Sequence, residues 1–248
     1  MIIEANNLVK FYGLNQALKS FSLEVPTGGV FALLGPNGAG KTTFIKCLLG
    51  LIKIESGELN VFGETASGHD FKKRVSYLPE RFSFHGFYTA KQVVELYAKA
   101  KDVSPEEING QVSSAIKKAG LEELNQKKLA EMSKGQRQRV GIACLMVGTA
   151  DLIILDEPFS GLDPLGIRDL KKLILELKTE GKTIFLNSHI LSEVESLCDH
   201  YAIINKGELI EQGELSHALK NGSLEEHFYQ LLSEKNLTTS LPAGEIHE

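Results

Sequence analysis

A glycine-rich segment between an apolar run and an amphipathic stretch constrains the fold of this 248-residue chain more than any other feature. Residues 30–34 form a short continuous apolar run, as expected for a strand that is covered on both faces. Residues 35–42, Gly-Pro-Asn-Gly-Ala-Gly-Lys-Thr, follow this run, and from Lys41 the apolar residues recur at helical spacing. A strand, a glycine loop and a helix in this order predict an α/β protein with a parallel sheet.

The same loop predicts a phosphate site. Glycines let backbone N–H groups converge on an anion, and the following helix presents the positive end of its dipole. In such a loop Lys41 reaches the terminal phosphates of a nucleotide, and the Thr42 hydroxyl binds Mg²⁺. Roughly 0.02 matches to the pattern are expected by chance in a chain of this composition. We therefore expect nucleotide contacts from the whole loop: Gly35, Pro36, Asn37, Gly38, Ala39, Gly40, Lys41, Thr42 and Thr43.

Two adjacent carboxylates follow a second apolar run, residues 152–155. Asp156 and Glu157 are therefore expected at the carboxyl edge of a central strand, where parallel sheets bind their ligands. Because neighbouring side chains point in different directions, Asp156 can hold a metal ion while Glu157 activates water. The plainer alternative is a pair of solvated charges ahead of Pro158.

The alternation of apolar runs and helical patterns divides the chain into three expected parts. Residues 1–81 and 150–213 form a nucleotide-binding core, in which residues 1–30 and about 56–65 make a small antiparallel layer. Residues 82–149 form a helical subdomain, whose helix starts are marked by a capping box at 89–92 and by Ser104-Pro105. Residues 214–248 form C-terminal helices and a loose tail. Further elements are expected at 167–180 (helix), 183–187, 201–205 and 208–211 (strands).

Composition excludes several classes of protein. The 27 Lys and Arg against 32 Asp and Glu give a net charge of −5 without basic clusters, which disfavours nucleic acid as a partner. The three cysteines are too widely spaced to indicate a zinc site or a disulfide framework. No apolar run approaches the roughly 18 residues that span a bilayer, and the first residues lack a signal-peptide pattern. We therefore expect an intracellular globular protein.

The order of the motifs resembles the ATP-binding cassette (ABC) ATPase family. The phosphate loop is followed by Met132-Ser133-Lys134-Gly135-Gln136 and then by Ile154-Leu155-Asp156-Glu157-Pro158. Ser160-Gly161-Leu162-Asp163 resembles the D-loop of the family, Ser188-His189 its switch histidine, and Tyr12 its adenine-stacking aromatic residue. These motifs extend over about residues 3–213, and residues 77–80 resemble the exporter-associated branch that pairs with separate permeases.

The resemblance implies a P-loop NTPase core with a small antiparallel β layer and an inserted α-helical subdomain. It also implies ATP and Mg²⁺ as ligands, and two copies of the subunit, identical or different, that enclose two ATP molecules between them. Ser133, Gly135 and Gln136 of one copy then face the γ-phosphate bound by the other, and Asp163 links the two sites. Glu157 polarises water, and His189 steadies the γ-phosphate.

The resemblance further implies that the chain is an ATP-hydrolysing subunit that drives a transporter, with an exporter favoured. Such a subunit is expected in the cytoplasm at the inner face of the cell membrane, held there by transmembrane permease subunits. The alternatives are an ABC ATPase of a soluble assembly that transports nothing, and a regulatory sensor that binds nucleotide without hydrolysis. The presence of Glu157 argues against a sensor, which has no need of a general base.

Several of these residues also have simpler explanations. The segment from Ser133 to Gln136 is by itself an ordinary capping box at a helix start. His189 and Tyr12 are of types that often only pack or hydrogen-bond near a core. Two positions depart from the usual family pattern: Lys134 replaces a glycine, and Glu80 stands where glutamine is usual. We expect the Glu80 carboxylate to act near the metal and the γ-phosphate.

A cluster of aromatic residues follows Glu80: Phe82, Phe84, Phe87 and Tyr88. Four aromatic side chains within seven residues are many for a chain in which 7% of residues are aromatic. They either fill the helical subdomain or expose an apolar surface to another protein. In the family the corresponding groove receives a helix of the permease.

Overall fold

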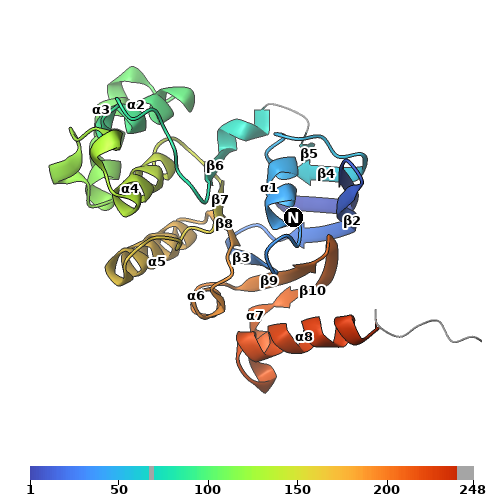
Figure 1. Ribbon diagram of the computed structural model, residues 1–248. Coiled ribbons are helices and arrows are strands. Elements are labelled where there is room, and N and C mark those ends of the chain that lie inside the picture. The colour runs from blue at the N-terminus through green and yellow to red at the C-terminus, as the bar shows by residue number, and fades with distance from the viewer. Residues whose placement is uncertain (67–69, 239–248) are drawn as a thin grey trace, which may run out of the picture.

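A computed structural model describes residues 1–66 and 70–238, and shows an α/β fold with two sheets (Figure 1). The larger sheet has six strands in the order β10-β9-β3-β8-β7-β6. All its neighbouring strands are parallel except β9 and β10, which pair as an antiparallel hairpin. Its strands are β3 (Gly29–Leu34), β6 (Val75–Leu78), β7 (Leu152–Asp156), β8 (Thr183–Asn187), β9 (His200–Asn205) and β10 (Glu208–Glu214).

The smaller sheet is the expected antiparallel layer. Its strand order is β2-β1-β4-β5, and every pairing in it is antiparallel. The strands are β1 (Ile3–Tyr12), β2 (Asn15–Val25), β4 (Ser56–Val61) and β5 (Glu64–Thr65). The sequence therefore predicted the class of the fold and both kinds of sheet correctly.

Helix α1 (Lys41–Leu48) lies between the two sheets and places the phosphate loop. Its buried Phe44 is 5.1 Å from Phe21 of β2 and 5.8 Å from Phe185 of β8, measured between ring centroids. Both neighbours are themselves fully buried, so one apolar core holds the helix against both sheets. The first turn of α1 is thereby fixed at the carboxyl end of β3.

The chain between β6 and β7 forms a group of helices beside the sheets (Figure 1). The helices are α2 (Ala90–Ala100), α3 (Pro105–Lys118) and α4 (Lys134–Leu145). Both predicted capping boxes are present, with Thr89 at the start of α2 and Ser133 at the start of α4. The apolar faces of these helices join one continuous core with helix α5 (Pro164–Thr179) and with strands β7 and β8.

The remaining helices are α5 (Pro164–Thr179), α6 (Leu191–Glu195), α7 (Leu215–Ala218) and α8 (Leu224–Thr238). The prediction of a helix from residue 167 was wrong by one turn, because Asp163 caps the helix and Pro164 opens it. Strand β10 also runs three residues further than predicted. The expected loose tail, in so far as it covers residues 239–248, lies outside the described residues. None of the helices in the described part of the chain is both long enough and apolar enough to cross a bilayer.

Candidate nucleotide-binding site

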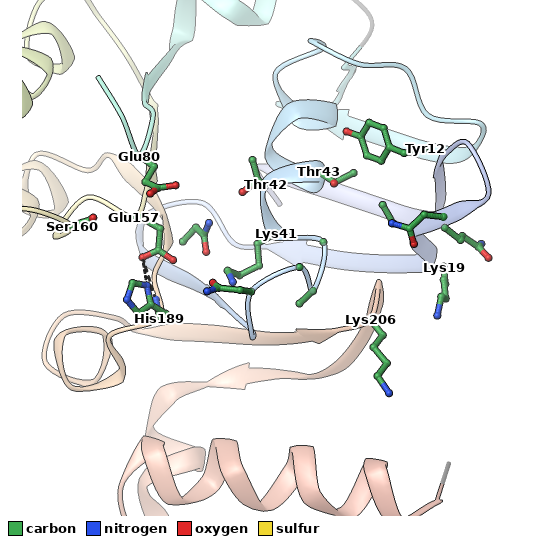
Figure 2. A pocket seen from close by; sticks show the side chains of 18 of the residues that line it. Tyr12, Lys19, Lys41, Thr42, Thr43, Glu80, Glu157, Ser160, His189 and Lys206 are labelled. Carbon is green, nitrogen blue, oxygen red and sulfur yellow. Dashed lines mark hydrogen bonds and ion pairs between the residues drawn. The ribbon is translucent and has the colours of Figure 1, made fainter. Parts of the chain in front are cut away.

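A cavity of about 840 Å³ opens at the carboxyl end of β3 and is lined by the phosphate loop and the start of α1 (Figure 2). Asn37, Gly38, Ala39 and Gly40 line it, followed by Lys41, Thr42 and Thr43. Glu80, Glu157 and His189 lie on one side of the cavity, and Tyr12 lies on the other. Segments that are distant in sequence therefore meet around the predicted phosphate site.

The glycines of the loop are required by its close packing. A Cβ atom on Gly35 would lie 2.3 Å from the carbonyl oxygen of Ile204. Gly40 has φ of 115° and would place a Cβ 2.7 Å from the carbonyl oxygen of Ala17. Any larger residue at either position would push the loop away from β2 and β9, so these glycines determine its shape.

Lys41 is folded onto the loop from which it starts. Its Nζ donates hydrogen bonds to the carbonyl oxygens of Gly35, at 2.6 Å, and of Pro36, at 3.1 Å. Burial lowers the pKa of Lys41, and the nearby carboxylates of Glu157 and Asp156 oppose that shift. The buried ammonium group is well placed for an anion, because a phosphate would supply the negative charge that carbonyl groups lack.

Asp156 is buried at the end of β7 beside Asn187 at the end of β8. One oxygen of Asp156 accepts a hydrogen bond from Asn187 Nδ2, and the other accepts one from the Tyr77 hydroxyl at 3.5 Å. Burial raises the pKa of Asp156, and the charge of Glu80 raises it further. Asn187 Oδ1 is also buried and has no hydrogen-bond partner. The carboxylate oxygens of Asp156 and Oδ1 of Asn187 can therefore bind a cation or a water molecule at this edge of the sheet.

These oxygen atoms suit Mg²⁺ better than a softer metal. Within the described residues there is no group of three or more His, Cys, Asp or Glu side chains that could enclose a metal ion. Magnesium commonly takes one or two protein oxygens and completes its shell with water and substrate phosphates. The Asp156 carboxylate and the Thr42 hydroxyl fit that requirement, with the Glu80 carboxylate close enough to Asp156 to affect its charge.

Glu157 and His189 form a hydrogen-bonded pair at the rim of the cavity. Glu157 Oε2 lies 2.7 Å from His189 Nδ1 and 3.4 Å from the His189 backbone nitrogen, which donates to it. Burial raises the pKa of the Glu157 carboxyl, and the His189 ring opposes the shift. The Glu157 backbone has φ of 50°, a left-handed conformation that is rare outside glycine, and its N–H donates to the carbonyl of Asn187. Such strain is typical of functional positions, and here it turns the carboxylate toward the cavity.

Tyr12 stands at the opposite side of the cavity from this pair (Figure 2). Its side chain is 47% exposed, so it does not serve as core packing. Lys10 Nζ lies 5.7 Å from the ring centroid, which leaves the other face of the ring for a planar ligand. The position agrees with base stacking as the role of Tyr12.

The other predicted contacts do not reach this cavity. Gly35, Pro36 and Asp156 adjoin residues that line it but are themselves absent from the lining, as are Ser133, Gly135, Gln136 and Asp163. Ser133 and Gln136 cap α4 reciprocally, at 3.1 and 3.2 Å, and Asp163 accepts a hydrogen bond from the Gly166 backbone at 2.8 Å to cap α5. Within one chain these residues therefore begin helices, and a nucleotide role for them requires a second molecule.

Lys134, the unusual residue of this segment, lies against the same chain. Its Nζ is 3.4 Å from Ser160 Oγ, and its side chain lies so close to Gly161 that a Cβ there would be 2.8 Å from Lys134 Cε. The lysine therefore joins the start of α4 to the loop after β7.

Sequence reasoning missed eight residues of the lining: Leu14, Asn15, Gln16, Ala17, Lys19, Ser160, Asn187 and Lys206. Asn187 could have been found, because it ends an apolar strand directly before Ser188-His189. Ser160 stood inside a recognised motif but was given no role. Lys19 and Lys206 reach the cavity only through strand pairing and packing, for which the sequence carries no local signal.

The model of the ABC transporter family matches residues 18–160 of the chain, which is more than half of its length. The chain belongs to the ABC transporter family. A Synechocystis relative described as an uncharacterized ABC transporter ATP-binding protein is 42% identical over 208 residues, which are 83% of this chain and 59% of the relative. The chain thus matches less than two thirds of the length of that relative. The bacitracin transport ATP-binding protein BcrA of Bacillus licheniformis is 38% identical over 222 residues, 88% of this chain and 72% of the relative.

Solved structures of ABC cassettes share the fold. One described as an ATP-binding subunit of an ABC transporter superimposes with a TM-score of 0.87 at 30% identity, over 94% of this chain and all of that chain. A dimeric bacterial ABC transporter cassette superimposes with a TM-score of 0.80 at 25% identity, over 86% and 98% of the two chains. These likenesses extend the family assignment across the sheets and the helical group.

Proposed function

We propose that the chain is the ATP-hydrolysing, nucleotide-binding subunit that powers an ABC transporter through ATP-driven closure of a dimer. The observation that carries this proposal is the Glu157–His189 pair at 2.7 Å, held at the rim of the cavity that the phosphate loop lines. A binding-only protein has no need of a partly buried, strained carboxylate opposite its phosphate site.

The phosphate loop and Lys41 bind the triphosphate of ATP. Backbone N–H groups at the start of α1 and the Lys41 ammonium group supply positive charge where the β- and γ-phosphates lie. Lys41 exchanges its carbonyl partners for phosphate oxygens, which gain more from a buried cation than neutral carbonyl groups do. Tyr12 stacks on the adenine at the other side of the cavity.

Thr42, Asp156 and Glu80 are the residues that would hold Mg²⁺. When bound, the ion neutralises charge on the phosphoryl group that is transferred. Asp156 is kept in place by Asn187 and Tyr77, so its carboxylate needs no rearrangement to accept a cation.

Glu157 positions and deprotonates the attacking water. Its raised pKa makes it a stronger base than an exposed carboxylate at neutral pH. His189 holds the carboxylate through Nδ1 and leaves Nε2 free to reach toward the γ-phosphate. Phosphoryl transfer depends mostly on positioning and charge, and both are supplied by residues at the ends of β7 and β8.

A second copy, identical or related, completes each site. Ser133 and Gly135 begin α4 away from the cavity of their own chain, and a capped helix start is a natural anion site. We therefore assign Ser133, Gly135 and Gln136 to the γ-phosphate held by the partner, and Asp163 to the communication between the two sites. The similarity to a dimeric cassette supports this arrangement.

The partner in the membrane is a separate permease, to which the chain binds at the cytoplasmic face. A second cavity of about 550 Å³ is lined by Phe82, Phe84 and Gly86 together with residues of α4. Phe82 is buried and Phe84 half-buried, whereas Phe87 is 64% exposed, so the aromatic cluster both fills the helical group and reaches its surface. An exposed apolar rim beside a cavity suits a permease helix. We propose export as the direction, because residues 77–80 resemble the exporter-associated branch of the family.

The alternative is an ABC ATPase that serves a soluble assembly. It would hydrolyse ATP with the same residues but would use the aromatic cluster to bind a soluble protein. Purification from detergent extracts distinguishes the two: a multi-span membrane protein that co-purifies with the chain supports the transporter. A soluble complex with ATPase activity and no membrane protein would favour the alternative.

The enzymatic part of the proposal is tested by Lys41→Ala. We expect ATP turnover of the purified chain, alone or with its permease, to fall by at least about 100-fold, because a buried phosphate contact is lost. Phosphate release is the measurement. Lys117→Ala on α3 is the matched control, because Lys117 is exposed and outside the cavity. Undiminished turnover in Lys41→Ala would contradict the assignment of the site.

A further inference from the structure

Two lysines that the proposed mechanism does not use line the same cavity as the phosphate loop. Lys19 lies on β2, and Lys206 lies in the turn between β9 and β10. Among residues 1–66 and 70–238, neither side-chain Nζ has a hydrogen-bond or ion-pair partner. Lys41, by contrast, is buried and hydrogen-bonded within the loop. Lys19 and Lys206 are therefore cations without an assigned counter-charge in the lining of the candidate nucleotide site.

Packing of the turn fixes where Lys206 stands. Lys206 and Gly207 have φ of 48° and 84°, the two left-handed residues that a tight type I′ hairpin turn requires. The Gly207 N–H donates to the carbonyl of Ala39 in the phosphate loop, and the Gly207 carbonyl accepts from the Lys19 N–H, both at 2.8 Å. A Cβ on Gly207 would lie 2.7 Å from the carbonyl oxygen of Ala17. The turn is thus wedged between the phosphate loop and β2, and it brings the two lysines together.

The charges of the cavity are distributed unevenly. Figure 2 shows Lys19 and Lys206 on the side of Tyr12, whereas Glu80, Glu157 and His189 lie on the other side. Carboxylates at the hydrolytic side repel an incoming polyphosphate, and the chain as a whole carries a net charge of −5. The positive charges of Lys19 and Lys206, on the side of Tyr12 where the adenine base is proposed to lie, offset this repulsion.

We propose that Lys19 and Lys206 act as a cationic pair that binds the phosphate chain of the nucleotide from the side of Tyr12. The pair sets the affinity for nucleoside di- and triphosphates, and Glu157 and His189 carry out the chemistry. The proposal rests on the proposed function, because it assumes that the cavity binds ATP. It adds two residues, from the second strand and the last hairpin, that determine the strength of that binding.

Isothermal titration of the full chain with Mg-ATP and Mg-ADP tests the pair. The variant is Lys19→Gln combined with Lys206→Asn, because asparagine tolerates the left-handed turn and so removes charge without changing the backbone. Lys19→Arg with Lys206→Arg keeps the charge, and Lys117→Gln removes one charge from an exposed site on α3. We expect the Kd values for ATP and ADP to rise about fivefold to tenfold in the uncharged variant. The arginine variant and the control should stay within about twofold of the parent chain.

Salt separates a charge effect from a structural one. At about 1 M NaCl, where the screening length falls to about 3 Å, the ratio of Kd values between variant and parent should approach one. The proposal would be overturned if the uncharged variant still bound ATP more weakly than the parent chain at high salt, or if the arginine variant did not bind ATP as tightly as the parent. In either case the shape of the turn, and not its charge, would be responsible. If the parent chain binds ATP and the uncharged variant binds it equally well, this inference alone fails. If the parent chain binds no ATP, the proposed function fails with it.

Discussion

Glu157 combines a strained backbone, a partly buried carboxylate and a histidine partner in a single residue. Its pKa is raised from the usual 4.5, first by burial, while His189 opposes the shift. A base acts only when it is deprotonated, so turnover falls as the pH drops through this raised pKa. We expect the acidic limb of the pH dependence of kcat to lie above 4.5, measured by phosphate release at saturating ATP.

The His189→Ala variant provides the check on this prediction. Removing the ring removes an interaction that lowers the pKa of Glu157, so the acidic limb of the residual activity should move to higher pH. An acidic limb of activity that stays in place or moves to lower pH would show that a group other than Glu157 controls it.

The raised pKa of Glu157 also affects the stability of the fold. The protein gains stability as the Glu157 carboxyl becomes protonated, and it loses that contribution as the pH rises through the pKa of the folded state.

Glu80 is the residue in which this chain departs from the family pattern at the metal edge. Its charge raises the pKa of Asp156, which places the two carboxylates within electrostatic reach of each other. A carboxylate here favours a bound cation, so Glu80→Gln should raise the half-saturating Mg²⁺ concentration for hydrolysis by about tenfold. A Mg²⁺ titration of ATPase activity measures this. Glu95→Gln on α2, outside the cavity, is the control, and an unchanged titration in Glu80→Gln would refute the role of Glu80.

Among individual residues of the site, the sequence predicted those that lie within short motifs. The phosphate loop, Asp156, Glu157 and His189 each follow a recognisable strand, and the structure brings all of them to one edge of the sheet. Lys19 and Lys206 were not predicted, because only the packing of the β9–β10 turn against β2 and the loop brings them to the cavity. Contacts that depend on packing between distant strands leave no local pattern in a sequence.

Helix α4 begins with a capping box, and this element has two roles that can be separated. Ser133→Ala removes the side-chain acceptor of the Gln136 N–H, which should cost about 1 kcal/mol and lower Tm by about 2–4 °C. Thr89→Ala removes the equivalent acceptor from α2, which does not face a proposed nucleotide site. Both variants should lose similar stability, measured by thermal unfolding monitored by circular dichroism.

Turnover should distinguish the two caps. We expect Ser133→Ala to reduce ATPase activity by about tenfold or more, because the proposed hydroxyl contact with the partner's γ-phosphate is lost. Thr89→Ala should retain the parent activity. Ser133→Asp retains a capping side chain but places a negative charge toward the phosphate, so it should be stable and inactive. Equal ATPase activities of Ser133→Ala and Thr89→Ala would show that Ser133 acts only as a helix cap.

The elements themselves were largely predictable from their periodicity and their end signals. Both capping boxes were placed correctly, and strands β9 and β10 lie where strands were expected. The start of α5 was misplaced because Asp163 was assigned to communication between sites, although Asp163-Pro164 is also a helix-start signal. Local signals therefore located the helices, whereas the division of the chain into three parts remains a prediction.

Closure of two copies around ATP is the prediction that belongs to the whole molecule. Glu157→Gln keeps the size of the side chain and its contact with His189 but removes the base, so ATP should remain bound between two copies. We expect the apparent mass in size-exclusion chromatography with Mg-ATP to double, and Lys41→Ala to stay monomeric under the same conditions. A Glu157→Gln chain that stays monomeric with saturating ATP, alone and with its permease, would contradict the sandwich mechanism.

The order of strands in the six-stranded sheet has a consequence for biosynthesis. β3, which leads into the phosphate loop, lies between β8 and β9, which follow much later in the chain. At elongation rates of roughly 5–20 residues per second, the loop therefore waits on the order of ten seconds on the ribosome before its neighbouring strands are made. ATP in the cell would stabilise the finished subunit, but it would give little protection to the nascent chain during that interval.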